Sequence, residues 1–409
     1  MARAQRGLPR RSWCLIWLLV LLAGVMAPGP AGAGFDLGGM EQAEGINATI
    51  GGDQDHPAAA GLSDGGFVAA WVDRHRGSPV EIRLATFDAD GTPRGGDVIV
   101  AEAANSQQVA AAGLSDGDLV VVWDMWRDDR NRYDLAARIY DAVGSPRSEV
   151  FYVAESGDYD YLPAVAALEG GGFVVSWTRT PRDGSRSGAV YCRRYDSAGQ
   201  AQGEAVLVSA EAEKLSRSAV SGLGQGAYVV AWDGMSWGVT GWDVHFQRYD
   251  AAGQLQGGVA TPSAQTLDIQ WNPTVTKVGE DRFVLVWVNL DTSKQATLRG
   301  RVYDLDGNPL AGETTLQGDT VYSQSRACAV GTEEGFAVAF SGQPAGQPRR
   351  VYLRYFDRNG ASSSDLLLPD TYQSDQQHPG LAALRRGLAV VWQAQGKDGS
   401  GWGVFGRRY

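Results

Sequence analysis

Cysteine is scarce, with three residues in a chain of 409. Cys14 lies in the N-terminal segment, and Cys192 and Cys328 fall in the third and sixth of the repeated units that the chain contains. Such units are not neighbours in a ring, whereas a disulfide needs Cα atoms within about 7 Å of each other. We therefore expect no disulfide and interpret both thiols as small buried apolar residues. Stability must then come from burial, which a chain of this size can supply.

Basic residues are too few to balance the acidic ones. The chain has 36 Lys and Arg against 47 Asp and Glu, a formal charge of -11. An acidic surface disfavours nucleic acid and anionic membranes as partners. We interpret it as a solubility feature of a protein that works outside the cell.

Helical periodicity is absent beyond the N-terminal segment, and that segment holds the only signal-like apolar run. Arginines precede an apolar stretch from Cys14 to Met26, and Ala31-Gly-Ala33 resembles a cleavage site. The stretch is short for a membrane span, which needs about 20 residues, although an uncleaved anchor is the alternative. Arg10-Arg11 leaves both ordinary and twin-arginine export open. Residues 1–33 are thus predicted to be a secretory signal, and the protein to be secreted, periplasmic or at the cell surface.

A strand-turn-strand pattern that ends in an aromatic residue occurs seven times. Its clearest copy is Pro163 to Trp177, in which a small, alanine-rich stretch and Gly-Phe-Val-Val-Ser-Trp flank a glycine turn. The closing aromatics are Trp71, Trp123, Trp177, Trp232, Trp287, Phe340 and Trp392, at steps of 52, 54, 55, 55, 53 and 52 residues. Repetition of strands at this period is typical of a propeller or a repeat array.

Each unit is predicted to hold four strands. The second has apolar residues on both faces, as expected for a sheet between two neighbours. The third ends in an aromatic-Asp pair such as Tyr195-Asp196, and a glycine turn leads to a more polar fourth strand. The small first strand suits the crowded axis of a ring.

The two ends of the repeats predict closure. The last unit stops after its third strand at Tyr409, and Glu44 to Ile50 stands before the first unit in the register of a fourth strand. Pairing of these segments would remove the exposed edges of an open array. We therefore predict an all-β fold: a single seven-bladed β-propeller of four-stranded antiparallel blades over residues 34–409, closed by an N-terminal strand on the C-terminal blade.

Several stretches resemble tandem repeats of large secreted or surface proteins of bacteria. The resemblance rests on Leu62 to Trp71, Lys397 to Tyr409 and the turn Asp304 to Pro309, and it extends over nearly all of the chain after residue 33. It implies a bacterial, exported, propeller-like protein. The family supplies no catalytic residues, so the resemblance implies a structure and not an activity.

One face of the ring is predicted to carry the variable loops. The turns between first and second strands and between third and fourth strands are short and alike, whereas the loops on the opposite face differ from blade to blade. Binding usually resides in such loops. Aromatic, Arg and Asp side chains there suit carbohydrate or a protein loop, although any single tryptophan could instead pack between blades. The candidate ligand-binding residues are Trp126, Arg127, Asp128, Tyr161, Trp237, Trp242 and Trp271.

The residues at the start of the first strands should surround the mouth of a central channel. They are His56, Gln108, Leu162, Arg217, Asn272, Ser325 and His378. Two histidines in blades that close against each other could bind a metal, but a metal site needs further ligands and Asp55 is the only local addition. We expect a polar channel mouth with no metal and no cofactor.

Calcium binding is not expected at the Asp-rich turns. Asp88-Ala-Asp-Gly91 and Asp304-Leu-Asp-Gly307 have calcium-like spacing, but the equivalent turns in other blades lack the second Asp. A calcium loop needs six or more oxygens. These segments are therefore interpreted as glycine turns.

Three functions remain open. The favoured one is a secreted, monomeric, non-catalytic module that binds glycan or a surface protein. A structural ring of an envelope assembly is the main alternative. The third, a polysaccharide hydrolase or lyase, would place two carboxylates about 5–10 Å apart at the channel mouth, with Asp128, Asp160 and Asp243 as candidates.

Overall fold

The computed structural model describes residues 43–48, 50–75, 77–183, 188–209, 214–235, 241–264, 268–317 and 322–409, all within the unit Phe35–Tyr409. These residues form strands and no helix, so none of them belongs to a helix that could cross a bilayer. Trp237, one of the predicted ligand-binding residues, lies outside the described residues.

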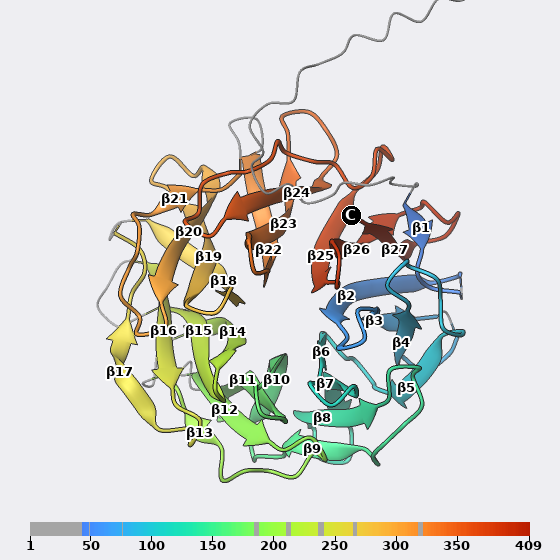
Figure 1. Cartoon of the computed structure of the whole chain (residues 1–409). Coiled ribbons are helices and arrows are strands. Elements are labelled where there is room, and N and C mark those ends of the chain that lie inside the picture. The colour runs from blue at the N-terminus through green and yellow to red at the C-terminus, as the bar shows by residue number, and fades with distance from the viewer. Residues whose placement is uncertain are drawn as a thin grey trace, which may run out of the picture. The chain divides into compact units, whose positions relative to one another are not determined.

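The strands form seven antiparallel sheets, which follow one another around a ring (Figure 1). From the axis outward, the first three blades are β2(Asp53–Gly61), β3(Phe67–Arg74), β4(Glu81–Phe87), β5(Val98–Glu102); β6(Val109–Gly113), β7(Leu119–Arg127), β8(Arg132–Tyr140), β9(Phe151–Ala154); and β10(Tyr159–Ala167), β11(Phe173–Thr180), β12(Ala189–Tyr195), β13(Val206–Leu207). The next two are β14(Lys214–Gly224), β15(Ala227–Met235), β16(Trp242–Tyr249), β17(Leu255–Ala260); and β18(Ile269–Val278), β19(Arg282–Leu290), β20(Ala296–Asp304), β21(Thr314–Thr315). The last two are β22(Tyr322–Gly331), β23(Gly335–Gln343), β24(Arg350–Asp357); and β25(Gln376–Ala383), β26(Leu388–Gln395), β27(Trp402–Arg408), β1(Glu44–Gly45).

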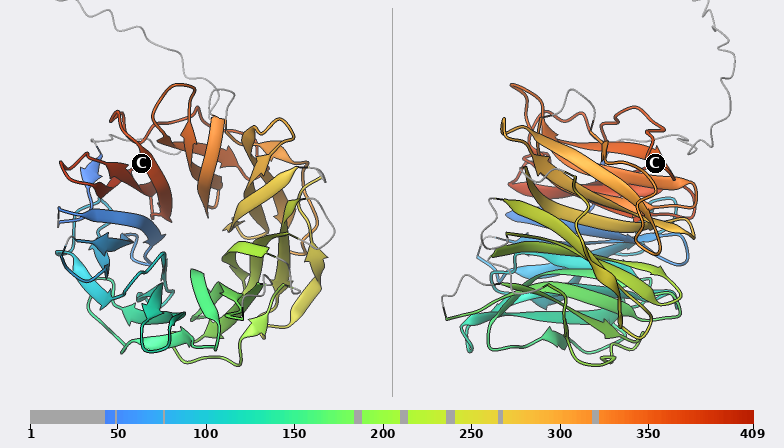
Figure 2. Two further views of the ribbon diagram at one scale, coloured as in Figure 1. Left: turned by 180° about the vertical axis from the view of Figure 1, so that it is seen from behind. Right: turned by 90° about the vertical axis from the view of Figure 1, so that its left-hand side faces the viewer.

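This arrangement is the predicted seven-bladed β-propeller, and Figure 2 shows the same ring from behind and edge-on. The sixth blade differs slightly, because its fourth position is a single bridge between Leu353 and Leu367 rather than a strand. The N-terminal closing strand is also shorter than the predicted Glu44 to Ile50. It pairs Glu44 with Gly406 and Gly45 with Phe405, after which the Asn47 side chain accepts a hydrogen bond from the backbone N–H of Val404 at 2.9 Å.

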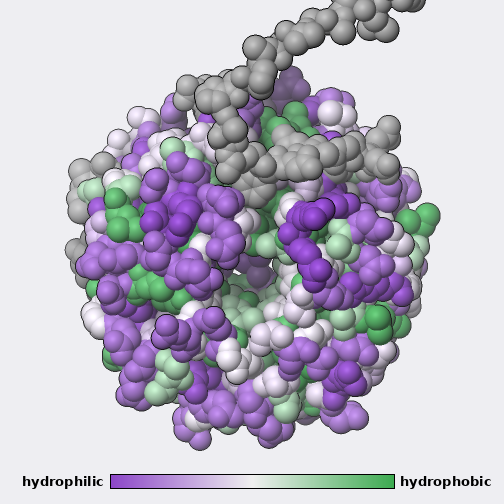
Figure 3. All heavy atoms as spheres, in the orientation of Figure 1, coloured by the Kyte–Doolittle hydropathy of each residue, from purple (hydrophilic) through white to green (hydrophobic). Residues whose placement is uncertain are grey.

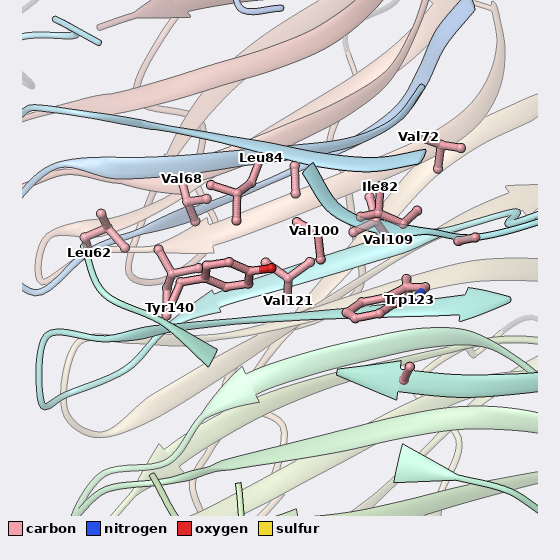
Figure 4. Packing of buried hydrophobic residues seen from close by; sticks show 14 residues of the cluster. Leu62, Val68, Val72, Ile82, Leu84, Val100, Val109, Val121, Trp123 and Tyr140 are labelled. Atoms are coloured by element: carbon pink, nitrogen blue, oxygen red, sulfur yellow. The ribbon is translucent and has the colours of Figure 1, made fainter. Parts of the chain in front are cut away.

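The second strand of each blade packs against both neighbouring blades. On β3, Phe67, Ala69 and Trp71 belong to the core shared with the seventh blade. Val68 and Ala70 alternate with them and belong to the core shared with the second blade, which Figure 4 shows from close by. Because successive side chains of a strand point to opposite faces, one apolar strand supplies two interfaces. Equivalent cores lie between all other successive blades.

The inner strands approach one another closely at their carboxyl ends. A Cβ added to Gly113 would lie 2.1 Å from the carbonyl oxygen of Gly61 on the inner strand of the preceding blade. A Cβ at Gly331 would lie 1.6 Å from the carbonyl oxygen of Lys277. Glycine at these positions is therefore required by the contact between backbones.

We predict that Gly113→Ala destabilises the protein by about 1–3 kcal/mol, since the added methyl group must push two inner strands apart. Thermal unfolding measures the effect. Gly95→Ala is the matched control, because no atom lies within 4 Å of a Cβ at that position. Equal melting temperatures for the two variants would contradict the close approach.

Candidate functional site

The seven residues that start the inner strands occupy equivalent positions, which we call the mouth ring. The strand register places one inner-strand residue opposite the closing aromatic, as Val109 lies opposite Trp123 and Ser218 opposite Trp232, and the mouth residue directly precedes it. The ring comprises His56, Gln108, Leu162, Arg217, Asn272, Arg326 and His378. Six of them match the prediction. In the sixth blade the position belongs to Arg326 and not to Ser325, because the closing Phe340 pairs with Ala327, 13 residues before it, whereas Trp123 pairs with Val109, 14 residues before it.

Four mouth residues hold a left-handed backbone conformation. His56, Leu162, Asn272 and His378 have φ between 51° and 55°, and each lies in a register shift of its inner strand. Residues other than glycine seldom adopt this conformation unless the surrounding structure holds it. Because four blades share this strained conformation, we interpret it as a regular feature of the mouth ring.

Buried acceptors that follow the closing tryptophans hold the mouth backbone in place. The Asp124 carboxylate accepts hydrogen bonds from the backbone N–H groups of Gln107 and Gln108 in its own blade, and of Leu162 in the next blade. Asp233 accepts from the N–H groups of Arg217 and Asn272 at 2.8 and 2.7 Å. Both carboxylates are fully buried, so each joins the mouth residues of two successive blades.

Gln393 has the same place in the seventh blade, where its Oε1 accepts a hydrogen bond from the backbone N–H of His56 at 2.9 Å. This bond crosses the closure of the ring. In three of the seven blades, one side chain of the second strand thus accepts a hydrogen bond from the backbone of the mouth residue in the following blade.

We predict that Asp124→Ala lowers the free energy of unfolding by about 3 kcal/mol or more, because it leaves buried N–H groups of two blades without an acceptor. Chemical denaturation measures this loss. Asp128→Ala, four residues away at an exposed position, should change stability by less than about 0.5 kcal/mol. Similar losses in both variants would contradict the role of Asp124.

The inner strands surround a cavity of about 190 Å³, which is lined mostly by residues from the middle of these strands. Figure 3 shows that the ring is hollowed at its centre. The polar residues that line this inner cavity include Gln108, Arg217, Asn272 and Arg326. Arg217 Nη1 donates a hydrogen bond to Gln108 Oε1 at 2.6 Å, which joins the fourth blade to the second. Mouth residues from distant parts of the chain therefore meet in one cavity.

The predicted histidine pair is present at the closure between the first and seventh blades. The ring centroids of His56 and His378 lie 4.3 Å apart. Asp55 Oδ1 lies 3.0 Å from His56 Nδ1, and Asp55 Oδ2 accepts a hydrogen bond from Arg74 Nε at 2.9 Å. A carboxylate on Nδ1 fixes the tautomer of an imidazole and leaves Nε2 as the basic nitrogen.

His378 is half-buried close to the positively charged side chains of Arg217 and Arg326. Burial lowers its pKa to about 2, and the charges of Arg326, His56 and Arg217 act in the same direction. Gln393 on β26 opposes the shift through a hydrogen bond. His378 is therefore neutral at physiological pH.

We predict that the His378 ring does not take up a proton between pH 8 and pH 5, as followed by NMR of the labelled ring. The unfolded chain binds this proton near pH 6.5 and the folded chain does not. The free energy of unfolding should therefore fall by up to about 1.4 kcal/mol per pH unit below that point. His378→Gln should flatten this part of the pH profile, and a ring titration midpoint near 6.5 would refute the assignment.

An aromatic cluster extends from the mouth over the second and third blades. Trp126 pairs with Tyr133 across β7 and β8, with ring centroids 5.1 Å apart, and it stacks on Tyr159 at 6.3 Å. Tyr161 lies 6.4 Å from Tyr133 and directly precedes the mouth residue Leu162. Gln107 Nε2 also donates to Tyr133 Oη at 3.0 Å. We call Trp126, Tyr133, Tyr159 and Tyr161 the aromatic cluster.

The remaining predicted loop residues do not converge on this cluster. The guanidinium of Arg127 forms two hydrogen bonds with Asp129 and one with Tyr152, and Asp128 is exposed. Trp242 is half-buried on β16. Trp271 packs in part against the core between the fifth and sixth blades.

The three predicted carboxylates have different surroundings. Asp160 is fully buried, accepts hydrogen bonds from Trp177 Nε1 and Arg179 Nε, and so has a structural role. Burial raises the pKa of Asp243, whereas His245 lowers it. Asp128, Asp160 and Asp243 come from three different blades, and no contact brings two of them together among the described residues.

The opposite face is built from turns. In these turns the first Asp accepts backbone N–H groups two and four residues later, as Asp141 does from Val143 and Ser145. A hollow of about 420 Å³ on this face is lined by residues that include Glu169, Lys277 and Glu333. The Asp oxygens are thus engaged in the turns themselves, as expected from the glycine-turn interpretation.

Sequence reasoning missed Arg326, Tyr133, Tyr159 and the bridging carboxylates. Trp123-Asp124 and Trp232-Asp233 share a Trp-Asp pair, which could have identified the carboxylates. Nothing in the sequence alone indicates that Tyr159 stacks on Trp126, because the two residues belong to different blades.

No known family model and no curated protein matches the chain. Solved structures do match. The Penicillium chrysogenum alpha-L-arabinanase complexed with arabinobiose has 15% identity and a TM-score of 0.54, with 74% of this chain and 93% of that chain covered. The Hadza microbial sialidase Hz136 has 13% identity and a TM-score of 0.51, with 80% and 73% covered. The β-propeller domain of the Trilobed protease from Pyrococcus furiosus has 8% identity and a TM-score of 0.50, with 84% and 92% covered.

These likenesses establish the propeller fold, in agreement with the strand topology. They also correct the expectation of a non-catalytic glycan- or protein-binding module. The two neighbours above that are named for carbohydrates are enzymes, an arabinanase and a sialidase, so a non-catalytic binder is not supported.

Proposed function

We propose that this propeller is a carbohydrate-active enzyme that cleaves a glycosidic bond at the mouth ring. The observation that carries the proposal is the continuity between the aromatic cluster and the mouth, through Tyr161 next to Leu162 and through Gln107 next to Gln108. The names of the structural neighbours agree with it. At their low identity they support the fold only, so the argument depends on the residues of this chain.

The aromatic cluster is suited to hold a saccharide chain. Flat aromatic faces pack on the apolar faces of sugar rings, and tyrosine hydroxyls supply polar contacts. Trp126 and Tyr159 are nearly parallel, at 21°, and belong to successive blades. A chain bound along them would reach the mouth at Leu162.

The Asp55–His56 pair is suited to transfer a proton. A general base must present a nitrogen of fixed tautomer, and a carboxylate on the other ring nitrogen provides that orientation. Asp55 holds His56 in this way at 3.0 Å, and Arg74 in turn donates a hydrogen bond to Asp55 at 2.9 Å. His56 is therefore the proposed catalytic residue and Asp55 its positioning residue.

Export belongs to the same proposal. The N-terminal segment has the features of a secretory signal, and an exported enzyme meets polymeric saccharides outside the cell. We propose that residues 34–409 act there as a monomer.

Purified protein should release shorter products from at least one member of a panel of neutral and acidic oligosaccharides, measured by chromatography. His56→Gln should lower kcat about 100-fold or more, since general base catalysis contributes at least that factor. His245→Gln is the control, because His245 contacts Thr261 and Trp232 on the fourth blade and lies outside the mouth ring. Unchanged kcat in His56→Gln would exclude His56 as the base.

Trp126→Ala should raise KM about fivefold with a smaller effect on kcat, because one stacked ring contributes about 1 kcal/mol to binding. Trp242→Ala is the matched control. No cleavage of any saccharide in the panel by folded protein would refute the proposed function.

A further inference from the structure

We infer that the inner cavity binds the carboxylate of an acidic saccharide, a uronate, through the guanidinium groups of Arg217 and Arg326. This inference rests on the proposed function and names its substrate class. The two arginines come from the fourth and sixth blades, and both line the cavity of about 190 Å³.

Arg326 is a half-buried cation without a carboxylate partner among the described residues. Its Nη1 is buried and has no hydrogen-bond partner there. The charged group that acts on it most strongly is the second cation, Arg217. An unpaired guanidinium donor in a cavity is costly, and an oxyanion between two such groups removes that cost.

The carboxylates near Arg217 are already engaged. Asp124 and Asp233 both act on its charge, but their oxygens accept the backbone N–H groups that hold the mouth ring. Arg217 itself donates from Nη1 to an amide oxygen, that of Gln108. The cavity therefore presents cationic donors on its wall, while the anionic groups face the backbone between the blades.

A carboxylate fits this arrangement better than a neutral sugar does. A guanidinium offers parallel N–H donors that match the two oxygens of a carboxylate. The amides of Gln108 and Asn272 also line the cavity and can complete the hydrogen bonds of a bound anion without adding negative charge. The acidic exterior of the protein would not attract such a ligand, so recognition depends on this cavity.

A bound uronate gives the Asp55–His56 pair a defined reaction, β-elimination. The C5–H bond is activated by the neighbouring carboxylate, and its proton transfers to Nε2 of His56. The electron pair forms the C4–C5 double bond while the C4–O glycosidic bond breaks, and the leaving oxygen takes a proton from water. The hydroxide that remains takes the proton from His56, which restores the neutral ring. This route needs no pair of free carboxylates, in contrast to glycoside hydrolysis.

Calorimetry with the whole protein of residues 34–409 tests the site, with a galacturonate oligomer, a neutral galactose oligomer of equal length and inorganic sulfate as probes. The galacturonate oligomer should bind about 10-fold more tightly than the neutral one, and added salt should weaken it. Arg326→Gln should reduce its affinity about 10-fold, the loss expected for a charge-assisted hydrogen bond. The affinity of Arg326→Lys should lie between those of the unaltered protein and Arg326→Gln, because lysine keeps the positive charge but lacks the parallel N–H donors of a guanidinium.

Arg147→Gln, an exposed arginine on the turn face, is the matched control and should bind like the unaltered protein. Thermal unfolding verifies that each variant is folded. The His378 ring provides a second readout, because a bound carboxylate should raise its pKa in NMR titrations of the unaltered protein and not of Arg326→Gln.

Equal affinity for the neutral and acidic oligomers, or unchanged binding by folded Arg326→Gln, would overturn the inference. Binding of sulfate with no preference for the uronate over the neutral oligomer would overturn the substrate class. Cleavage of neutral saccharides alone would refute this inference and leave the proposed function intact. Uronate binding without cleavage of any saccharide would refute the proposed function instead, and an unsaturated uronate product, detected by its ultraviolet absorbance, would support both.

Discussion

The close packing of seven inner strands around one axis is the constraint on which the structure depends. Each blade must bury both faces of its second strand, so the blades can only be stable as neighbours of one another. The small residues of the inner strands and the glycines at their carboxyl ends, such as Gly113 and Gly331, allow this approach. The two-residue strand β1 then completes the seventh blade and removes the edge of β27.

The mouth ring follows from the same constraint. The backbones meet at the carboxyl ends of the inner strands, so larger polar side chains find room only near the amino ends. There the bulges place His56, Leu162, Asn272 and His378 in a left-handed conformation, which is unfavourable in isolation. Buried acceptors such as Asp124 offset that cost because they tie the mouth backbone to the rigid second strands. The strained backbone of the mouth is thereby held by hydrogen bonds to buried side chains, as a preorganised site requires.

The architecture was largely predictable because its cause is local and repeated. An apolar second strand that ends in tryptophan specifies a sheet buried on both faces, and seven copies at one period specify the ring. The site was predictable only in part. Arg326 was missed because the residue that pairs with the closing Phe340 is one position nearer to it than in the second blade, and an apolar pattern does not report this change of register.

The aromatic cluster was missed for a different reason. Trp126 was identified as a candidate, but its partner Tyr133 is defined by the register of the β7–β8 hairpin and Tyr159 by contact between blades. Such neighbours depend on tertiary geometry. Sequence patterns indicate which face carries the variable loops, whereas the grouping of side chains on that face requires coordinates.

The contrast between exterior and cavity shows why net charge is a poor guide to the ligand of this protein. The chain carries an excess of acidic residues, many of them in exposed turns where water and salt screen their charge. Arg217 and Arg326 line a cavity walled by the inner strands, where a charge acts more strongly over the same distance than it does at the open surface. Burial is the largest cause of the lowered pKa of His378, and the charges of both arginines lower it further, against the sign of the whole molecule. Two half-buried cations can thus decide what the cavity accepts, even though the acidic surface would disfavour the same ligand at long range.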